Sequence, residues 1–139
     1  MRITLESDYA LRILTSLAYK DTVTDAGSIA EETSVSPRFA LKILHKLTQG
    51  GLVKSFKGVR GGYRLNVEPE AITLRRVIEL IDGPIVIARC LENQEECSIG
   101  CDKTSCAYHH IFDAVSLDLA RRLERITIAD VINKTYSLE

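Results

Sequence analysis

The chain has 139 residues, of which 45% are hydrophobic, and its formal net charge is −1. This length suits one domain, or a small domain with an extension. No stretch approaches the ~18 consecutive apolar residues of a membrane helix. The charged N-terminus MRITLESDYALRIL also lacks the apolar core of a signal peptide. We therefore expect a cytoplasmic protein without a membrane partner, a setting in which cysteine thiols stay reduced.

Charge is distributed unevenly along the chain. Residues 1–66 contain ten Lys and Arg against six Asp and Glu, whereas residues 67–139 contain eight against thirteen. Residues 33–67 contain no acidic residue and seven basic ones: Arg38, Lys42, Lys46, Lys54, Lys57, Arg60 and Arg64. A solvated face usually mixes both signs. A basic face on a nearly neutral protein instead indicates docking on a polyanion.

Two helices are predicted at the start of the chain. Apolar residues at helical spacing predict an amphipathic helix over residues 6–19, with Glu6 or Ser7 near its start. After a polar loop, Ser28 looks like an N-cap, and the acid three positions later would complete a capping box. This predicts a second, short helix over residues 29–33.

A third helix and a hairpin follow. Ser36 suits an N-cap and the proline after it suits the first helical position, so a helix is expected over residues 37–49. The Gly50-Gly51 pair ends that helix by supplying a left-handed residue. Residues 52–56 and 63–65 predict two strands joined by the glycine-rich basic loop KGVRGG. This order of elements is that of a winged helix-turn-helix, a mainly α fold with a small β-hairpin wing.

The second half of the chain predicts a long projecting helix. Thr73 caps an expected helix over residues 73–81, and residues 85–87 read either as a short strand or as an extended buried segment. Residues 90–106 look irregular. A helix over residues 108–125 carries a narrow apolar seam, and a short helix over 127–133 caps either the domain or a dimer. The seam consists of Phe112, Val115, Leu119, Leu123 and Ile126.

Such a seam favours pairing with a second copy of the chain, and packing on its own domain is the alternative. We therefore divide the chain into three parts. Residues 1–67 form the DNA-binding domain, on which helix 73–81 packs. Residues 84–107 form a cysteine-rich sensor loop, and residues 108–139 provide the dimerisation helix and the C-terminal helix.

The helix from Pro37 is the expected recognition helix, because a helix-turn-helix places its second helix in the major groove. Arg38 and Lys42 lie on its early outer face and can read guanine, and Leu41 can touch a thymine methyl group. Three hydroxyls sit where helix N-termini meet phosphate groups. They belong to Ser28, Thr33 and Ser36.

The wing contributes a second set of basic residues. Lys57 and Arg60 lie at its tip, and the glycines beside them let the loop enter or straddle the minor groove. Lys46 and Lys54 are expected to contact phosphate, which adds salt dependence without sequence information.

Four cysteines and a histidine fall within a short segment. Cys90, Cys97, Cys101 and Cys106 are followed by His109, and this irregular spacing matches neither familiar zinc pattern. Thiolates at such spacing suit an iron–sulfur cluster as well as zinc, and reactive free thiols are a third interpretation. A ligand at the start of the long helix would couple the state of the metal to the dimer.

The segments SDYALRIL, SPRFALKILHKLTQGGLV, KGVRGGYRL and RCLENQEEC resemble one bacterial family over nearly the whole chain. It is the Rrf-type family (IscR-, NsrR- and CymR-like) of dimeric winged-helix transcriptional regulators. Several of its members carry an iron–sulfur cluster held by three cysteines and one other ligand. The resemblance implies that Cys90, Cys97 and Cys106 are the three cysteines, with His109 or Asp8 as the fourth ligand.

This sequence departs from the family's cluster binders in two ways. The gap between Cys97 and Cys106 is longer, and Cys101 is additional. Cys101 is therefore another candidate for the fourth ligand, or a partner of Cys106 in place of Cys97. The nuclearity of the cluster, 2Fe–2S or 4Fe–4S, stays open, as does zinc in its place.

Together these features predict a homodimeric, sequence-specific regulator, a repressor, that binds a pseudo-palindromic DNA operator. No nucleophile–base pair with an orienting third group is visible, so we expect neither an enzyme nor a small-molecule substrate. A zinc- or thiol-based regulator without iron is the alternative.

Overall fold

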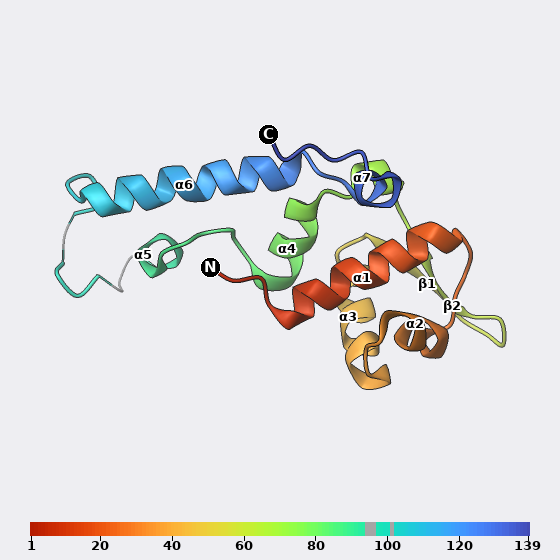
Figure 1. Cartoon of the computed structure of the whole chain (residues 1–139). Coiled ribbons are helices and arrows are strands. Elements are labelled where there is room, and N and C mark those ends of the chain that lie inside the picture. The colour runs from red at the N-terminus through yellow and green to blue at the C-terminus, as the bar shows by residue number, and fades with distance from the viewer. Residues whose placement is uncertain (94–96, 101) are drawn as a thin grey trace.

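The structure is a computed structural model that describes residues 1–93, 97–100 and 102–139. Helices dominate it, and one antiparallel hairpin provides the strands, as the sequence predicts (Figure 1). The elements, in chain order, are α1 (Leu5–Lys20), α2 (Ala26–Thr33), α3 (Pro37–Gln49), β1 (Val53–Phe56), β2 (Gly62–Leu65), the 3₁₀ turn η1 (Pro69–Ala71), α4 (Leu74–Asp82), α5 (Arg89–Glu92), α6 (Ala107–Glu124) and α7 (Ile128–Asn133). None of the helices in these described ranges has the length and apolar character needed to cross a bilayer.

Side-chain caps fix where the first three helices begin. Thr4 caps α1 and Ser36 caps α3, each accepting a hydrogen bond from a backbone N–H three residues later. The predicted cap at Ser28 is wrong. Asp25 is the N-cap of α2, and its carboxylate accepts hydrogen bonds from both the N–H and the hydroxyl of Ser28. A carboxylate satisfies two donors at once, so α2 begins at Ala26, earlier than expected.

The first three helices enclose the main core. Ile13, Ile29 and Leu44 are fully buried there, one from each helix. Ile72, Val77 and Ile128 join the same cluster from later in the chain. Burying a side chain of this size stabilises the fold by roughly 1.5–3 kcal/mol. Helix α3 is thus anchored by its inner face, which leaves its outer face free.

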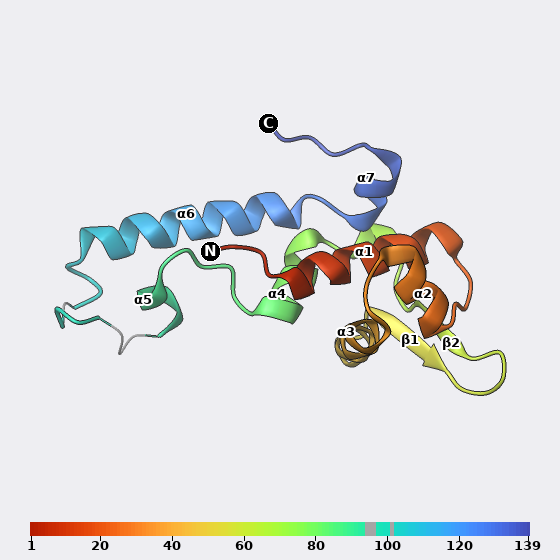
Figure 2. The same cartoon turned by 60° about the horizontal axis from the view of Figure 1, so that its bottom comes forward.

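The hairpin packs beside α2 through a close backbone approach. Val53 pairs with Leu65 and Phe56 with Gly62, and an isolated bridge joins Tyr63 to Thr24 in the loop before α2. A Cβ at Gly62 would lie 2.3 Å from the carbonyl oxygen of Thr24, so this position requires glycine. The wing is therefore held at its base while its tip extends into solvent (Figure 2).

The second half of the chain contributes α4 and α7 to the main core, whereas part of α6 projects away from it. Helix α4 ends at Asp82 with Gly83 as its C-cap, and residues 85–87 form no strand, although Ile85 is buried. The short helix α5 was not predicted. Helix α7 packs on α1. Hydrogen bonds from Leu74 N to Ile126 O and from Ile128 N to Ile72 O join the start of α7 to the segment that leads into α4. Within the chain, α7 therefore covers its own domain.

The predicted seam of α6 divides into two halves. Leu119 and Leu123 pack on a small cluster of Ile78, Ile85 and Ala120, so this half contacts its own chain. The other half projects away from α1–α3 in both views (Figures 1 and 2). It exposes an apolar strip at helical spacing, formed by Tyr108 (72% exposed), Ile111 (54%), Phe112 (37%) and Val115 (48%).

Candidate nucleic-acid interface and cysteine loop

Helices α2 and α3 form the helix-turn-helix, and α3 presents the predicted base-reading residues to solvent. Arg38, Leu41 and Lys42 are all exposed in its first two turns. Leu41 is 49% exposed, which is unusual beside the fully buried Ile43 and Leu44. An exposed apolar side chain flanked by two cations suits a groove that offers both thymine methyl groups and acceptor atoms.

The hydroxyls predicted to meet phosphate differ in their surroundings. The Oγ of Ser28 donates to Asp25 at 2.7 Å, and hydrogen bonds from Ser28 lower the pKa of the Asp25 carboxyl. Ser36 is exposed and caps α3. The hydroxyl of Thr33 is buried and donates to the carbonyl oxygen of Ile29 at 2.6 Å, which occupies it inside the helix. Ser36 is thus the most exposed of the three serine and threonine residues.

One acidic side chain reaches α3 although the sequence of that region contains none. Glu6, in the first turn of α1, pairs with Lys46 at 2.7 Å and with Lys42 at 3.6 Å. Sequence analysis missed this residue because the contact joins positions far apart along the chain. No local spacing signals it.

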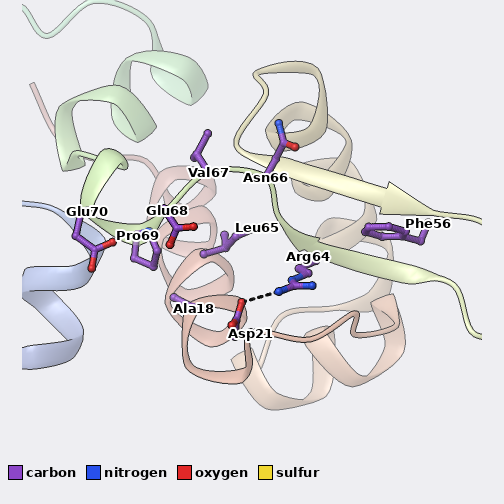
Figure 3. Close-up of a pocket in the computed structure, with 10 residues that line it drawn as sticks. All are labelled: Ala18, Asp21, Phe56, Arg64, Leu65, Asn66, Val67, Glu68, Pro69 and Glu70. Atoms are coloured by element: carbon purple, nitrogen blue, oxygen red, sulfur yellow. Dashed lines mark hydrogen bonds and ion pairs between the residues drawn. The ribbon is translucent and has the colours of Figure 1, made fainter.

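The wing exposes Lys57, Val59 and Arg60 at its tip, so the two predicted cations stand clear of the domain. Arg64 on β2 behaves differently. Its guanidinium donates at 3.1 Å to the carboxylate of Asp21, the C-cap of α1. There it lines a cavity of about 450 Å³ together with the acids Glu68 and Glu70 (Figure 3). Arg64 therefore belongs to a mixed-charge surface, whereas Lys57 and Arg60 form the basic tip.

The predicted ligands lie on several elements. Cys90 is in α5, Cys97 precedes a turn, and Cys106 is the N-cap of α6; each is partly exposed. His109 lies in the first turn of α6, while Asp8 lies on α1 and pairs with Arg12 at 2.6 Å. Cys101 lies outside the described residues.

The thiol chemistry of this loop fits a soft metal or an iron–sulfur cluster. Among residues 1–93, 97–100 and 102–139, no three His, Cys, Asp or Glu side chains come together as metal ligands. His110 is held elsewhere, with its Nε2 atom 3.1 Å from the carbonyl oxygen of Thr104.

Comparison with known proteins identifies the family. A model of the Rrf2 family, described as iron-dependent transcriptional regulators, matches residues 3–134. The chain belongs to the Rrf2 family. It is similar to the transcriptional regulator NsrR of Bacillus subtilis, with 29% identity across 95% of this chain and 90% of that protein. It is also similar to CymR of the same species, with 37% identity across 68% of this chain and 70% of that protein.

The Rrf2 fold is matched by a solved structure as well. The structure of CymR, described as the global cysteine regulator of B. subtilis, aligns with a TM-score of 0.73 at 29% identity. The alignment covers 98% of this chain and 99% of that one. The chain is thus a winged-helix transcriptional regulator, and its relatives are regulators rather than enzymes. Their function implies that DNA is its partner.

Proposed function

We propose that this Rrf2-family regulator is a sequence-specific, homodimeric repressor controlled by its cysteine loop. The observation that carries the proposal is the outer face of α3. Arg38, Leu41 and Lys42 are exposed together on a helix whose inner face is fully buried, and the basic wing tip lies on the same domain. A rigid helix with exposed cations and one exposed apolar side chain suits major-groove reading.

Each part of the interface has a separate role in this proposal. Arg38, Leu41 and Lys42 read base edges, and Lys57 and Arg60 enter or straddle the minor groove. Ser36 lies at the start of α3, where a helix N-terminus favours phosphate. Ser28 lies in the first turn of α2, and it would contact phosphate only by releasing the Asp25 carboxylate. Phosphate contacts fix the register of the protein on the duplex, and base contacts supply the specificity.

A second copy of the chain is the proposed partner of α6. The strip from Tyr108 to Val115 follows the i, i+3, i+4, i+7 spacing of a helix–helix interface. It lies N-terminal to the part of α6 that contacts its own chain, where Ser116 and Ala120 are buried. A dimer with a twofold axis would present two recognition helices to a pseudo-palindromic site, as such operators require.

The proposed cofactor is an iron–sulfur cluster. Cys90, Cys97 and Cys106 would hold it, with His109, Asp8 or Cys101 as the fourth ligand. When bound, it would supply a redox- and ligand-sensitive group beside the start of α6.

The test is anaerobic purification followed by an absorption spectrum and analysis for iron, sulfide and zinc. Visible charge-transfer bands with matching iron and sulfide support the cluster, and loss of the bands in Cys106→Ala would assign that ligand. A colourless protein even after cluster reconstitution would contradict the cluster and move the assignment to a zinc or thiol switch. The longer gap between Cys97 and Cys106 and the extra Cys101, which depart from the family's cluster binders, favour that second candidate.

Operator binding is tested separately from the cofactor. Sites selected from a random duplex library by the cluster-loaded and cluster-free proteins should be palindromic, with half-sites about one helical turn apart. The two forms should differ in affinity at one fixed salt concentration, because a ligand shifts an equilibrium only through differential affinity. Equal operator affinities of the two forms would contradict control by the cysteine loop, although DNA binding itself would still stand.

A further inference from the structure

The feature that the proposed function leaves unexplained is Glu6. This carboxylate lies against the recognition helix, and its side chain is only 18% exposed. One oxygen is 2.7 Å from Nζ of Lys46 and the other is 3.6 Å from Nζ of Lys42. The closer contact lacks aligned hydrogen-bond geometry, so the attraction is that of an ion pair. A single acid therefore engages two of the three cations on α3.

Glu6 is held in place by its backbone. Thr4, the N-cap of α1, donates through both its N–H and its hydroxyl to the carboxylate of Asp82 at the end of α4. The same hydroxyl accepts from Ser7 N at 3.2 Å. The first turn of α1 is thus clamped between two helices. The backbone that carries Glu6 is therefore fixed, and the low exposure of its side chain limits how far the carboxylate can move aside when another anion approaches Lys46.

The charges decide what this contact does at a DNA surface. Phosphate groups bind Lys and Arg independently of sequence and supply nearly all of non-specific affinity. A fixed carboxylate beside Lys42 and Lys46 competes with phosphate for these ammonium groups and repels the phosphate directly. Because Glu6 is mostly shielded from solvent, salt screens this competition less than it screens an exposed pair.

We propose that Glu6 is a specificity-determining residue that limits phosphate binding by Lys42 and Lys46. The proposal rests on α3 being the recognition helix. On unrelated DNA the protein depends on phosphate contacts, so Glu6 weakens that mode of binding. On the operator, Lys42 turns to a base edge, and Arg38 and Leu41 add their own contacts. Glu6 therefore lowers the affinity for the operator less than it lowers the affinity for unrelated DNA. Glu6 thereby widens the ratio between specific and non-specific affinity.

The experiment measures binding of full-length protein to a random duplex and to the selected operator by fluorescence anisotropy across a salt series. Glu6→Gln keeps the length of the side chain and removes its charge. Glu79→Gln is the matched control, because Glu79 pairs with Arg75 on α4 at 3.2 Å and its loss changes the net charge equally. Circular dichroism melting checks that both variants fold.

The expected result is that Glu6→Gln binds the random duplex roughly two- to five-fold more tightly than Glu79→Gln, the scale of a single ion pair. The slope of log affinity against log salt should steepen by up to ~0.9 for each phosphate newly engaged. Operator affinity should rise less than affinity for the random duplex. Equal behaviour of the two variants, or weaker binding by Glu6→Gln, would overturn the proposal.

A double-mutant cycle distinguishes failure of the Glu6 inference from failure of the proposal that α3 is the recognition helix. Lys46→Gln should weaken binding to random DNA at least about two-fold more in the Glu6→Gln background than when Glu6 is present. Equal losses in both backgrounds would show that Glu6 does not occupy Lys46 and would reject the inference alone. If Arg38→Ala, Lys42→Gln and Lys46→Gln all leave DNA binding unchanged in both backgrounds, the recognition helix itself is misassigned.

Discussion

The DNA-binding head (residues 1–67) and the cysteine–α6 region (residues 84–124) differ in how far their apolar side chains are buried within one chain. In the head, α1, α2 and α3 bury a shared core, and their caps and ion pairs lie within the same unit. In the other region, the described cysteines Cys90, Cys97 and Cys106 lie in separate segments, and half of α6 exposes large apolar side chains. One chain thus completes the core of the head, whereas half of α6 keeps an apolar strip exposed. The proposed second copy of the chain would cover that strip, and the proposed cluster would bind beside it.

The largest expected effect is the loss of stability caused by a substitution in the core of the head. Leu44→Ala removes a fully buried side chain from the inner face of α3 and should lower the free energy of unfolding by about 2–5 kcal/mol. Leu41→Ala is the matched control on the outer face, and it should change stability by less than about 0.5 kcal/mol. Urea unfolding measures both variants. Equal destabilisation would contradict the division of α3 into a core face and a reading face.

The next effect tests whether the second region needs a partner. Val115→Glu places a charge in the exposed strip of α6, where a dimer interface would have to bury it unpaired, so the protein should become monomeric. Leu117→Glu is the control, since Leu117 is also exposed but lies on a different side of α6. Light scattering after size-exclusion chromatography reports the mass. A dimeric Val115→Glu protein would remove this strip from the interface.

The two regions also differ in how well sequence predicted them. Strong local signals set the head: Ser36 and Pro37 start α3, Gly51 with φ +76° ends it, and alternating burial along the helix follows its periodicity. The cap of α2 was misassigned because Ser28 and Asp25 are both good caps, and only the fold shows that the carboxylate satisfies two donors.

Local sequence patterns do not predict contacts between residues that lie far apart in the chain. The pairing of Glu6 with Lys46 depends on how α1 crosses α3, and the division of the α6 seam depends on where α4 ends. The ligand set of the cysteine loop stays a prediction for a related reason. Flexible spacing permits several combinations of thiols, and Cys101 lies outside the described residues. The sequence therefore indicated the kind of chemistry without selecting the ligands.

A smaller effect is expected at the wing. Arg60→Ala should weaken operator binding by about 1–3 kcal/mol if Arg60 reads the minor groove. Arg64→Ala removes the same charge from the same hairpin, but Arg64 is paired with Asp21 on the mixed-charge surface, so its loss should cost less. Anisotropy titrations at one salt concentration compare the two. Equal losses would mean that only net charge matters, and no loss for Arg60 would make it a bystander.

The smallest effect concerns α7, the element that ties the end of the chain back to the head. Hydrogen bonds from the N–H and hydroxyl of Thr127, and from the hydroxyl of Thr135, lower the pKa of Asp130 in this capping box. A carboxyl whose pKa is lower in the folded protein stabilises it above the unfolded pKa of ~3.9, and that stabilisation disappears as pH falls through the folded value. Thermal unfolding of the wild type should therefore lose more stability between neutral pH and pH ~3 than that of Asp130→Asn. Because Asp130 is solvent-accessible, high salt should shrink the difference. Parallel curves for the two proteins would mean that α7 is held by the buried Ile128 and Ala129 rather than by its cap.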